Sequence, residues 1–369
     1  MHGRLRIWRE GRQGLVVPHA LCQTVGMSSS TENLSILLIS DGRPGHFNLA
    51  EGIVAAFERL RPVDVRRLEV RRPVWMPGRV LSTLVNRSMA PERILASVFG
   101  VDRLSVGKPD LVISAGGNTL AANIAAARMT GAANIFYGSL RRHRAEDFSL
   151  VMTSYAAQAD VPNRLMTLKP SKLDPDALGL SRSDSHETPR TLGLIIGGDS
   201  GTVRYGQADW AKLLDFVQAQ HAIGTRWIVA NAPRTPEAFS NQLAMLSEVN
   251  DTPIADFIDV RTAGPGTLGV LLAASDAVVC TADSSTMLSE TVWMRRPVVA
   301  ICPELFSLPH NESIYRAWLA EMGWSRQMPI RSLTPDSLAD ALAEIVPLDV
   351  NPLDALATQL QERLPQLWS

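Results

Sequence analysis

Cysteine is scarce in this sequence, with only three residues among 369. Cys22, Cys280 and Cys302 lack the spacing of a metal site, so a cysteine-ligated metal is not expected. Cys280 and Cys302 fall within two short apolar runs that are typical of buried strands. We therefore expect both to be free core thiols, which suits a protein of a reducing compartment.

A surplus of charge and a long hydrophobic run are missing as well. The 36 Lys and Arg residues are balanced by 37 Asp and Glu residues, which argues against a general nucleic-acid-binding protein. No stretch approaches the roughly 20 uninterrupted apolar residues of a transmembrane helix, so we do not expect an integral membrane protein. With 46% hydrophobic residues, a chain of this length predicts two globular domains.

The first 26 residues do not have the pattern of a folded domain. Four arginines stand against a single acid, Glu10, and there is no apolar stretch of a secretory signal. A basic leader with few acids can resemble an organelle transit peptide. Met27 precedes a polar lead into the first strand. We expect residues 1–32 to be an over-extended start or a disordered tail.

Strands and helices alternate along the rest of the chain, which predicts an α/β fold with parallel sheets and helices on both faces. The first domain is expected at residues 33–178 and the second at 191–345. Residues 179–190 are polar and aperiodic, which predicts a linker, and residues 346–369 are predicted to be a helical tail. The predicted strands cover residues 35–40, 63–70, 109–114, 134–137, 150–153, 191–196, 226–230, 277–280 and 298–302.

Two turns with glycines follow predicted strands of the first domain. Residues 41–46 (DGRPGH) precede one helix, and residues 116–118 (GGN) precede another. Glycines between strand and helix let the backbone approach a ligand closely, although a turn without a ligand explains them almost as well. His46 is a candidate general base because imidazole titrates near neutrality, and a capping or structural histidine is the alternative.

Residues 272–303 carry the most informative pattern of the second domain. A short strand runs into the polar turn 281–285, and a helix and a second strand follow. Small residues at the helix start leave backbone N–H groups free to bind an anion such as a diphosphate, and Glu290 is placed to accept hydrogen bonds from ribose hydroxyls. The alternative is that Asp283 or Ser284 only caps the helix.

The segment from Arg61 to Arg103 contains nine arginines and four acids, interleaved with apolar residues such as Trp75. Arginines beside an apolar face suit contact with an anionic membrane surface. An ordinary surface helix with its apolar side on the core is the alternative. We expect a cytoplasmic protein, peripheral on the inner face of the cytoplasmic membrane if the first interpretation holds.

Three motifs of the chain resemble the loops of GT-B glycosyltransferases, in particular the N-acetylglucosaminyltransferase that forms lipid II. They are residues 41–46, the loop 197–201 (GGDSG), and residues 281–290 with Arg296-Pro297 after them. The bacterial branch of the ELM-type mitochondrial fission family is a closer match, over roughly residues 34–347. The resemblance implies a GT-B fold, in which two Rossmann-like domains face each other across a cleft.

The resemblance also implies an activity. This activity is the transfer of a sugar from a nucleotide-diphosphate sugar to a lipid-linked acceptor that is associated with a membrane or the cell envelope. The resemblance implies that the transfer inverts the configuration at the sugar and needs neither a metal nor a cofactor. His46 or Asp41 would deprotonate the acceptor, Glu290 would bind ribose, and Lys172 or Arg204 would stabilise the leaving diphosphate. The other implied substrate-binding residues are Gly42, Gly45, Gly116, Gly117, Asn118, Gly197, Gly198, Asp199, Ser200, Asp283, Ser284, Ser285, Met287, His310 and Asn311.

Two other classes of function stay open. A non-catalytic GT-B-like scaffold or fission-type protein would bind a nucleotide, or none, without turnover. A nucleotide-sugar 2-epimerase would need several acid and base groups around one sugar. Outside the leader and the linker, the chain offers only the histidines His46, His143, His221 and His310 for that chemistry.

Overall fold

The computed structural model describes residues 33–87, 89–155, 163–178, 190–201, 203–249, 251–264 and 266–368. The expected leader at residues 1–32 lies outside these described residues. So does the expected linker, apart from Arg190. Among the described helices, none is both long and apolar enough to cross a membrane.

The first sheet has six parallel strands in the order β2-β1-β3-β4-β5-β6. Five of them match the predicted strands within one or two residues. The sixth, β6, was not predicted because it is only three residues long and begins with an arginine. The strands are β1 (Leu34–Ser40), β2 (Val63–Glu69), β3 (Leu111–Ala115), β4 (Ala133–Tyr137), β5 (Leu150–Thr153) and β6 (Arg164–Met166).

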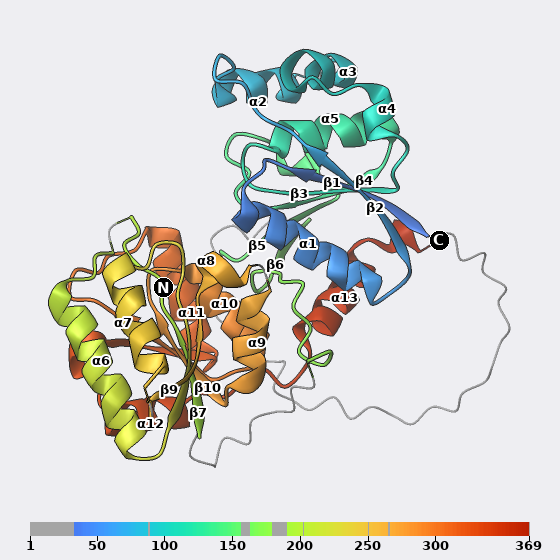
Figure 1. Ribbon diagram of the computed structural model, residues 1–369. Helices are drawn as coiled ribbons and strands as arrows, with labels where there is room; N and C mark the ends of the chain where they lie inside the picture. Colours follow the sequence, from blue (N-terminus) through green and yellow to red (C-terminus); the bar gives the residue numbers. More distant parts are fainter. Residues whose placement is uncertain are drawn as a thin grey trace, which may run out of the picture. The chain divides into compact units, whose positions relative to one another are not determined.

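Helices cover both faces of this sheet because the side chains of β1 alternate between two hydrophobic clusters. Ile36 and Leu38 pack with Ile53 of α1 (Pro44–Glu58), whereas Leu37 packs with Ile124 of α5 (Leu120–Thr130). Figure 1 shows α1 and α5 on opposite sides of the strands. The other helices of this half are α2 (Gly78–Asn86), α3 (Pro91–Ile94), η2 (Leu95–Phe99), α4 (Arg103–Val106) and η3 (Ala145–Asp147).

The second sheet also has six parallel strands, in the order β12-β11-β10-β7-β8-β9. Its strands are β7 (Thr191–Ile195), β8 (Arg226–Ala230), β9 (Ile254–Ile258), β10 (Ala277–Thr281), β11 (Val298–Cys302) and β12 (Ser325–Pro329). Its helices are α6 (Gln207–Ala222), α7 (Glu237–Ser247), α8 (Val260–Ala263), α9 (Thr267–Ala274), α10 (Ser285–Trp293), α11 (His310–Glu321), η5 (Ile330–Ser332) and α12 (Pro335–Ala343). The predicted α/β class with two Rossmann-like sheets is confirmed.

The strands β10 and β11 contain the two cysteines expected in the core. Both Cys280 and Cys302 are buried and free. Burial raises the pKa of each thiol to about 12, so both stay protonated at neutral pH. The expectation of free core thiols is confirmed.

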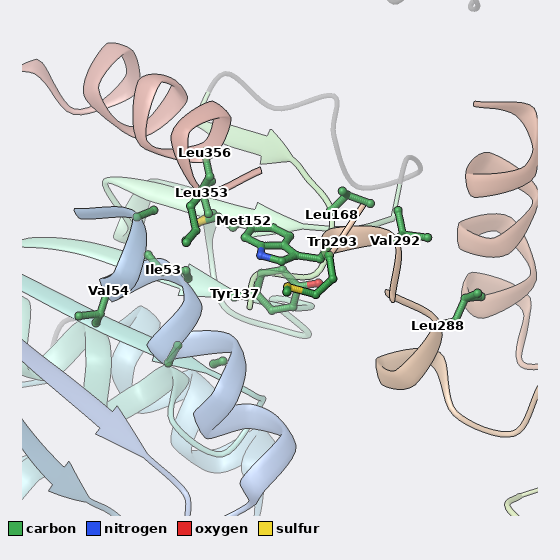
Figure 2. Packing of buried hydrophobic residues seen from close by; sticks show 14 of the residues in the cluster. Ile53, Val54, Tyr137, Met152, Leu168, Leu288, Val292, Trp293, Leu353 and Leu356 are labelled. Carbon is green, nitrogen blue, oxygen red and sulfur yellow. The ribbon is translucent and has the colours of Figure 1, made fainter. Parts of the chain in front are cut away.

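The C-terminal tail is helical, as predicted, but it packs against the first half rather than standing apart. It forms α13 (Pro352–Arg363) and η6 (Pro365–Leu367), and α13 lies beside α1 (Figure 1). Trp368 stacks on Phe57 of α1 with ring centroids 6.1 Å apart. One hydrophobic cluster therefore includes α1, α13 and residues of α10, among them Trp293 (Figure 2).

Each sheet has a topological switch point, where neighbouring strands lead to helices on opposite faces. In the first sheet β1 leads to α1 on one face, and β3 leads to α5 on the other. In the second sheet β7 leads to α6, and β10 leads to α10 on the opposite face. In open α/β sheets, ligands bind outside the carboxyl ends of the strands at such a point. The fold therefore marks two places where a site is expected.

Candidate functional site

The switch point of the first sheet holds an aspartate, a histidine and an asparagine. Asp41 follows β1, and its carboxylate oxygens lie 3.0 Å from Nδ1 of His46 in the first turn of α1. Asn118, in the turn after β3, donates from Nδ2 to the same carboxylate over 3.1 Å. The carboxylate only accepts hydrogen bonds, so Nδ1 of His46 carries the proton and Nε2 is left as a base.

The side chain of Asp41 is buried, whereas that of His46 is partly exposed to solvent. The Asp41 side chain is only 2% exposed, whereas that of His46 is 31% exposed. A buried aspartate orients the imidazole, and the exposed edge of the ring can accept a proton from a bound molecule. The sequence placed Asp41 and His46 in one turn, five residues apart, and could not show that Asn118 joins them.

Gly116 and Gly117 make room for side chains of this same site. A Cβ atom on Gly116 would lie 2.1 Å from Nδ1 of His46, and one on Gly117 would lie 2.4 Å from Cζ of Arg141. The backbone of Gly116 is also left-handed, with a φ of 85°. The two glycines were predicted to admit a ligand. In the structure, Gly116 instead lies against the imidazole of His46 and Gly117 against the guanidinium of Arg141. Gly42, with a φ of 76°, provides the turn, and Gly45 lies in the first turn of α1.

The switch point of the second sheet brings the loop after β7 against the loop after β10. Gly197 donates its N–H to Oγ1 of Thr281 over 2.7 Å, and a Cβ atom on Gly197 would lie 2.2 Å from the Asp283 carboxylate. A Cβ atom on Gly198 would lie 2.0 Å from the carbonyl oxygen of Arg234. Gly197 therefore lets the loop after β7 pack against the loop after β10, and Gly198 lets it pack against the loop after β8.

Asp283 and Ser284 hold this loop in shape, in two different ways. The side chain of Asp283 is fully buried, accepts a hydrogen bond from Thr281 over 2.7 Å and pairs with Arg234 over 2.7 Å. Ser284 is the N-cap of α10, where its Oγ accepts from the N–H of Met287 over 3.3 Å. The capping role that the sequence left open thus belongs to Ser284 and not to Asp283.

Glu290 lies in the second turn of α10, and no described residue donates a hydrogen bond to its carboxylate. Burial raises its pKa to about 7. A half-buried carboxyl group without a donor among the described residues is placed to accept hydrogen bonds from a ligand. This geometry fits the predicted role on ribose hydroxyls.

A lysine near the start of α10 was missed by the sequence analysis. Lys169 donates to Oγ of Ser285, lies 3.3 Å from the carboxylate of Glu312, and covers the ring of Tyr315 at 4.5 Å. Burial lowers the pKa of Lys169. Lys172, the predicted cation, instead pairs with Glu51 of α1 over 2.8 Å. Lys169 is therefore the lysine next to the helix start.

The remaining predicted residues of the second half lie in the loop after β7 and in the first turn of α11. Asp199 accepts from the N–H of Tyr205 over 3.0 Å and lies 3.6 Å from Nε of Arg204. Ser200 exchanges backbone hydrogen bonds with Val203, which closes a tight turn. His310 and Asn311 are exposed in the first turn of α11.

The only Asp-x-Asp sequence of the chain is Asp174-Pro175-Asp176. Asp174 pairs with Arg59 over 2.6 Å, and both aspartates accept hydrogen bonds from Asn351 at the start of α13. These carboxylates thus attach the C-terminal helix to the first half. Within the described ranges, no three His, Cys, Asp or Glu side chains are grouped as metal ligands. Metal independence stays a prediction.

A family of known proteins matches most of the chain. The family model described as Mitochondrial fission ELM1 matches residues 44–362. No curated protein matches the chain significantly.

Among solved structures, a putative UDP-N-acetylglucosamine 2-epimerase from Listeria monocytogenes is 12% identical, with a TM-score of 0.55, covering 92% of this chain and 98% of that chain. The UDP-GlcNAc 2-epimerase from Neisseria meningitidis, bound to UDP-GlcNAc, is 12% identical with a TM-score of 0.50, covering 90% of this chain and 100% of that chain. MurG of Acinetobacter baumannii is 13% identical with a TM-score of 0.49, covering 89% of this chain and 99% of that chain. The likeness to the two epimerase structures shows the fold.

Proposed function

Because the chain belongs to the mitochondrial fission ELM1 family and has the GT-B fold, we propose that it is a glycosyltransferase. Its donor is a nucleotide-diphosphate sugar, and its acceptor is a hydroxyl compound associated with a membrane or cell envelope. The observation that carries the proposal is the Asp41–His46 pair at the switch point of the first sheet, and its oriented imidazole supports a role for His46 as the base.

The second switch point supports donor binding in this proposal. The diphosphate lies at the start of α10, where backbone N–H groups and the positive end of the helix dipole stabilise negative charge. Lys169 adds a positive charge beside Ser285. Glu290 accepts hydrogen bonds from the ribose hydroxyls, which its lack of a protein donor permits.

In the reaction, the acceptor hydroxyl oxygen attacks the anomeric carbon of the donor sugar. Its proton passes to Nε2 of His46, and Asp41 stabilises the imidazolium that forms. The bond between the anomeric carbon and the diphosphate oxygen breaks, and the nucleoside diphosphate leaves with both electrons. The helix start and Lys169 stabilise the charge that develops on the leaving group.

Donor binding is tested first, by thermal unfolding with UDP-, GDP-, CMP- and dTDP-sugars. A donor present at 100 times its dissociation constant stabilises the protein by about 2.7 kcal/mol. We expect one nucleotide to raise the melting temperature of the wild type and to have little effect on Glu290→Ala. No shift with any donor would favour the non-catalytic scaffold.

Transfer is tested next, with the donor so identified and membrane lipid extracts as acceptors. We expect turnover by the wild type and a loss of about 100-fold or more in His46→Ala. His221→Ala is the matched control, since His221 lies at the end of α6 and faces Asp251. Acceptor-free conversion of the donor into its C2 epimer, followed by NMR, would identify an epimerase instead.

A further inference from the structure

A small cationic cavity opens beside the Asp41–His46 pair. It has a volume of about 250 Å³, and Arg72, Arg79, Arg141 and Arg142 line it. They come from two segments that are distant in the sequence, one leading into α2 and the other following β4. No carboxylate lines the cavity. The fold therefore gathers positive charge here from separate parts of the chain.

The charge of this cavity is not balanced by the protein. Among the described residues, none of these four guanidinium groups pairs with a carboxylate. Arg72 donates to the carbonyl oxygen of Met76 over 2.6 Å, which fixes its position without neutralising it. Four like charges around one cavity repel one another, and an anion bound between them removes that repulsion.

The cavity shares its wall with the proposed catalytic base. Gly117 and Asn118 both line it, and Asn118 donates to the carboxylate of Asp41 over 3.1 Å. The guanidinium of Arg141 lies over Gly117, on a backbone held at a φ of 54°. A non-glycine residue in this conformation carries strain, which the surrounding structure must hold in place. An anion in the cavity would thus lie beside Asp41 and His46.

We propose that this four-arginine cavity binds a phosphate or diphosphate group. Planar guanidinium groups bind phosphate oxygens with paired, charge-assisted hydrogen bonds, and several arginines around one cavity suit a multiply charged group. The assignment of that group to the sugar acceptor rests on the proposed function, whereas the phosphate site itself does not. The acceptor is then a phosphorylated or diphosphorylated hydroxyl compound.

Inorganic pyrophosphate is the probe for the site, and hydrogen exchange locates where it binds. We expect pyrophosphate to protect residues 72–82 and 138–143 from exchange. Arg79→Gln/Arg142→Gln should weaken this binding by at least about tenfold. The matched control is Arg93→Gln/Arg103→Gln, which removes the same charge from exposed positions outside the cavity. Protection confined to the loops near α10, or equal loss in both double variants, would overturn the proposal.

A second arm distinguishes a lipid headgroup from a water-soluble phosphate compound. Val74 is fully exposed and Trp75 is 66% exposed close to Arg72. If the phosphate belongs to a lipid, phosphatidylcholine vesicles containing phosphatidic acid should bind the protein, and Trp75→Ser should weaken only vesicle binding. If it belongs to a soluble compound, pyrophosphate binds and the vesicles do not. Both results support the site.

The outcomes also separate this proposal from the proposed function. A nucleotide-sugar shift that depends on Glu290, without pyrophosphate protection at the cavity, would overturn the phosphate site and leave the glycosyltransferase proposal standing. Protection at the cavity without any sugar transfer would support the phosphate site and count against the glycosyltransferase.

Discussion

The imidazole of His46 lies over Gly116, so the site of the first half depends on the absence of a side chain at one position. Gly116→Ala adds both a steric clash with His46 and the cost of a left-handed backbone. Gly131→Ala is a matched control, because Gly131 has a φ of 76° and open space around its Cα atom. The pair separates backbone strain from displacement of the base.

We expect both alanine variants to lose about 1–2 kcal/mol of stability from the left-handed backbone. Only Gly116→Ala should also displace His46 and reduce transfer by about 100-fold or more. Thermal unfolding and the transfer assay on both proteins measure the two effects. Equal losses of activity in Gly116→Ala and Gly131→Ala would show that the position of His46 does not matter.

The raised pKa of Glu290 leads to a prediction about stability. Burial raises its pKa to about 7 from the ordinary value of 4.5, so the folded protein holds this proton more tightly than the unfolded chain. The charged carboxylate therefore lowers stability increasingly from about pH 4.5 upward, with the full effect above about pH 7. Glu290→Gln should stabilise the protein by about 2 kcal/mol at pH 8 and much less at pH 5. Thermal unfolding of both proteins across this range provides the measurement.

The same pKa predicts how donor binding varies with pH. Ribose hydroxyls donate to the charged carboxylate, so they favour the deprotonated form and release a proton on binding. We expect the affinity for an intact nucleotide sugar to fall about tenfold between pH 8 and pH 6. Calorimetric titration measures this slope, and it should disappear in Glu290→Gln. A pH-independent affinity in the wild type would remove Glu290 from the donor site.

At the scale of elements, the sequence predicted nine of the twelve strands, missed β6, β9 and β12, and could not show which strands are neighbours. A strand that is buried on both faces, such as β11 at residues 298–302, is a continuous apolar run, so it can be predicted from its own residues. Strand order depends on contacts far apart in the chain, and this order brings Asn118 to Asp41. No sequence pattern around Lys169 or Arg141 pointed to a site, because each side chain contacts a segment that is distant in the sequence. Lys169 contacts Ser285 of α10, and Arg141 lies over Gly117.

The start of α10 yields the prediction at this scale. Ser284 caps the helix, so Ser284→Ala removes a bond to an otherwise unpaired N–H group and should cost about 1 kcal/mol. Ser284→Asp keeps the cap and should retain stability, but it places a negative charge where the donor diphosphate is proposed to lie. We expect Ser284→Asp to unfold near the wild-type temperature and to lose donor binding. Retained donor binding in Ser284→Asp would locate the diphosphate elsewhere.

At the scale of the whole molecule, the C-terminal helix joins what the sequence treated as separate parts. Leu360 of α13 is fully buried in the cluster that also contains Phe57 of α1 and Trp293 of α10. Trp293 donates from its indole nitrogen to the carbonyl oxygen of Leu173 over 2.8 Å, which adds a polar contact between distant segments. A shared core of this kind couples the unfolding of the elements that contribute to it.

Leu360→Ala tests this coupling. Removal of a buried leucine side chain should cost about 2–5 kcal/mol, whereas Glu362→Ala, at an exposed position of the same helix, should have almost no effect. If the shared cluster couples the two sheets, calorimetry should show one transition in both variants, at a lower temperature in Leu360→Ala. Two transitions, of which only one moves in Leu360→Ala, would mean that the halves unfold independently and that α13 stabilises the first half alone.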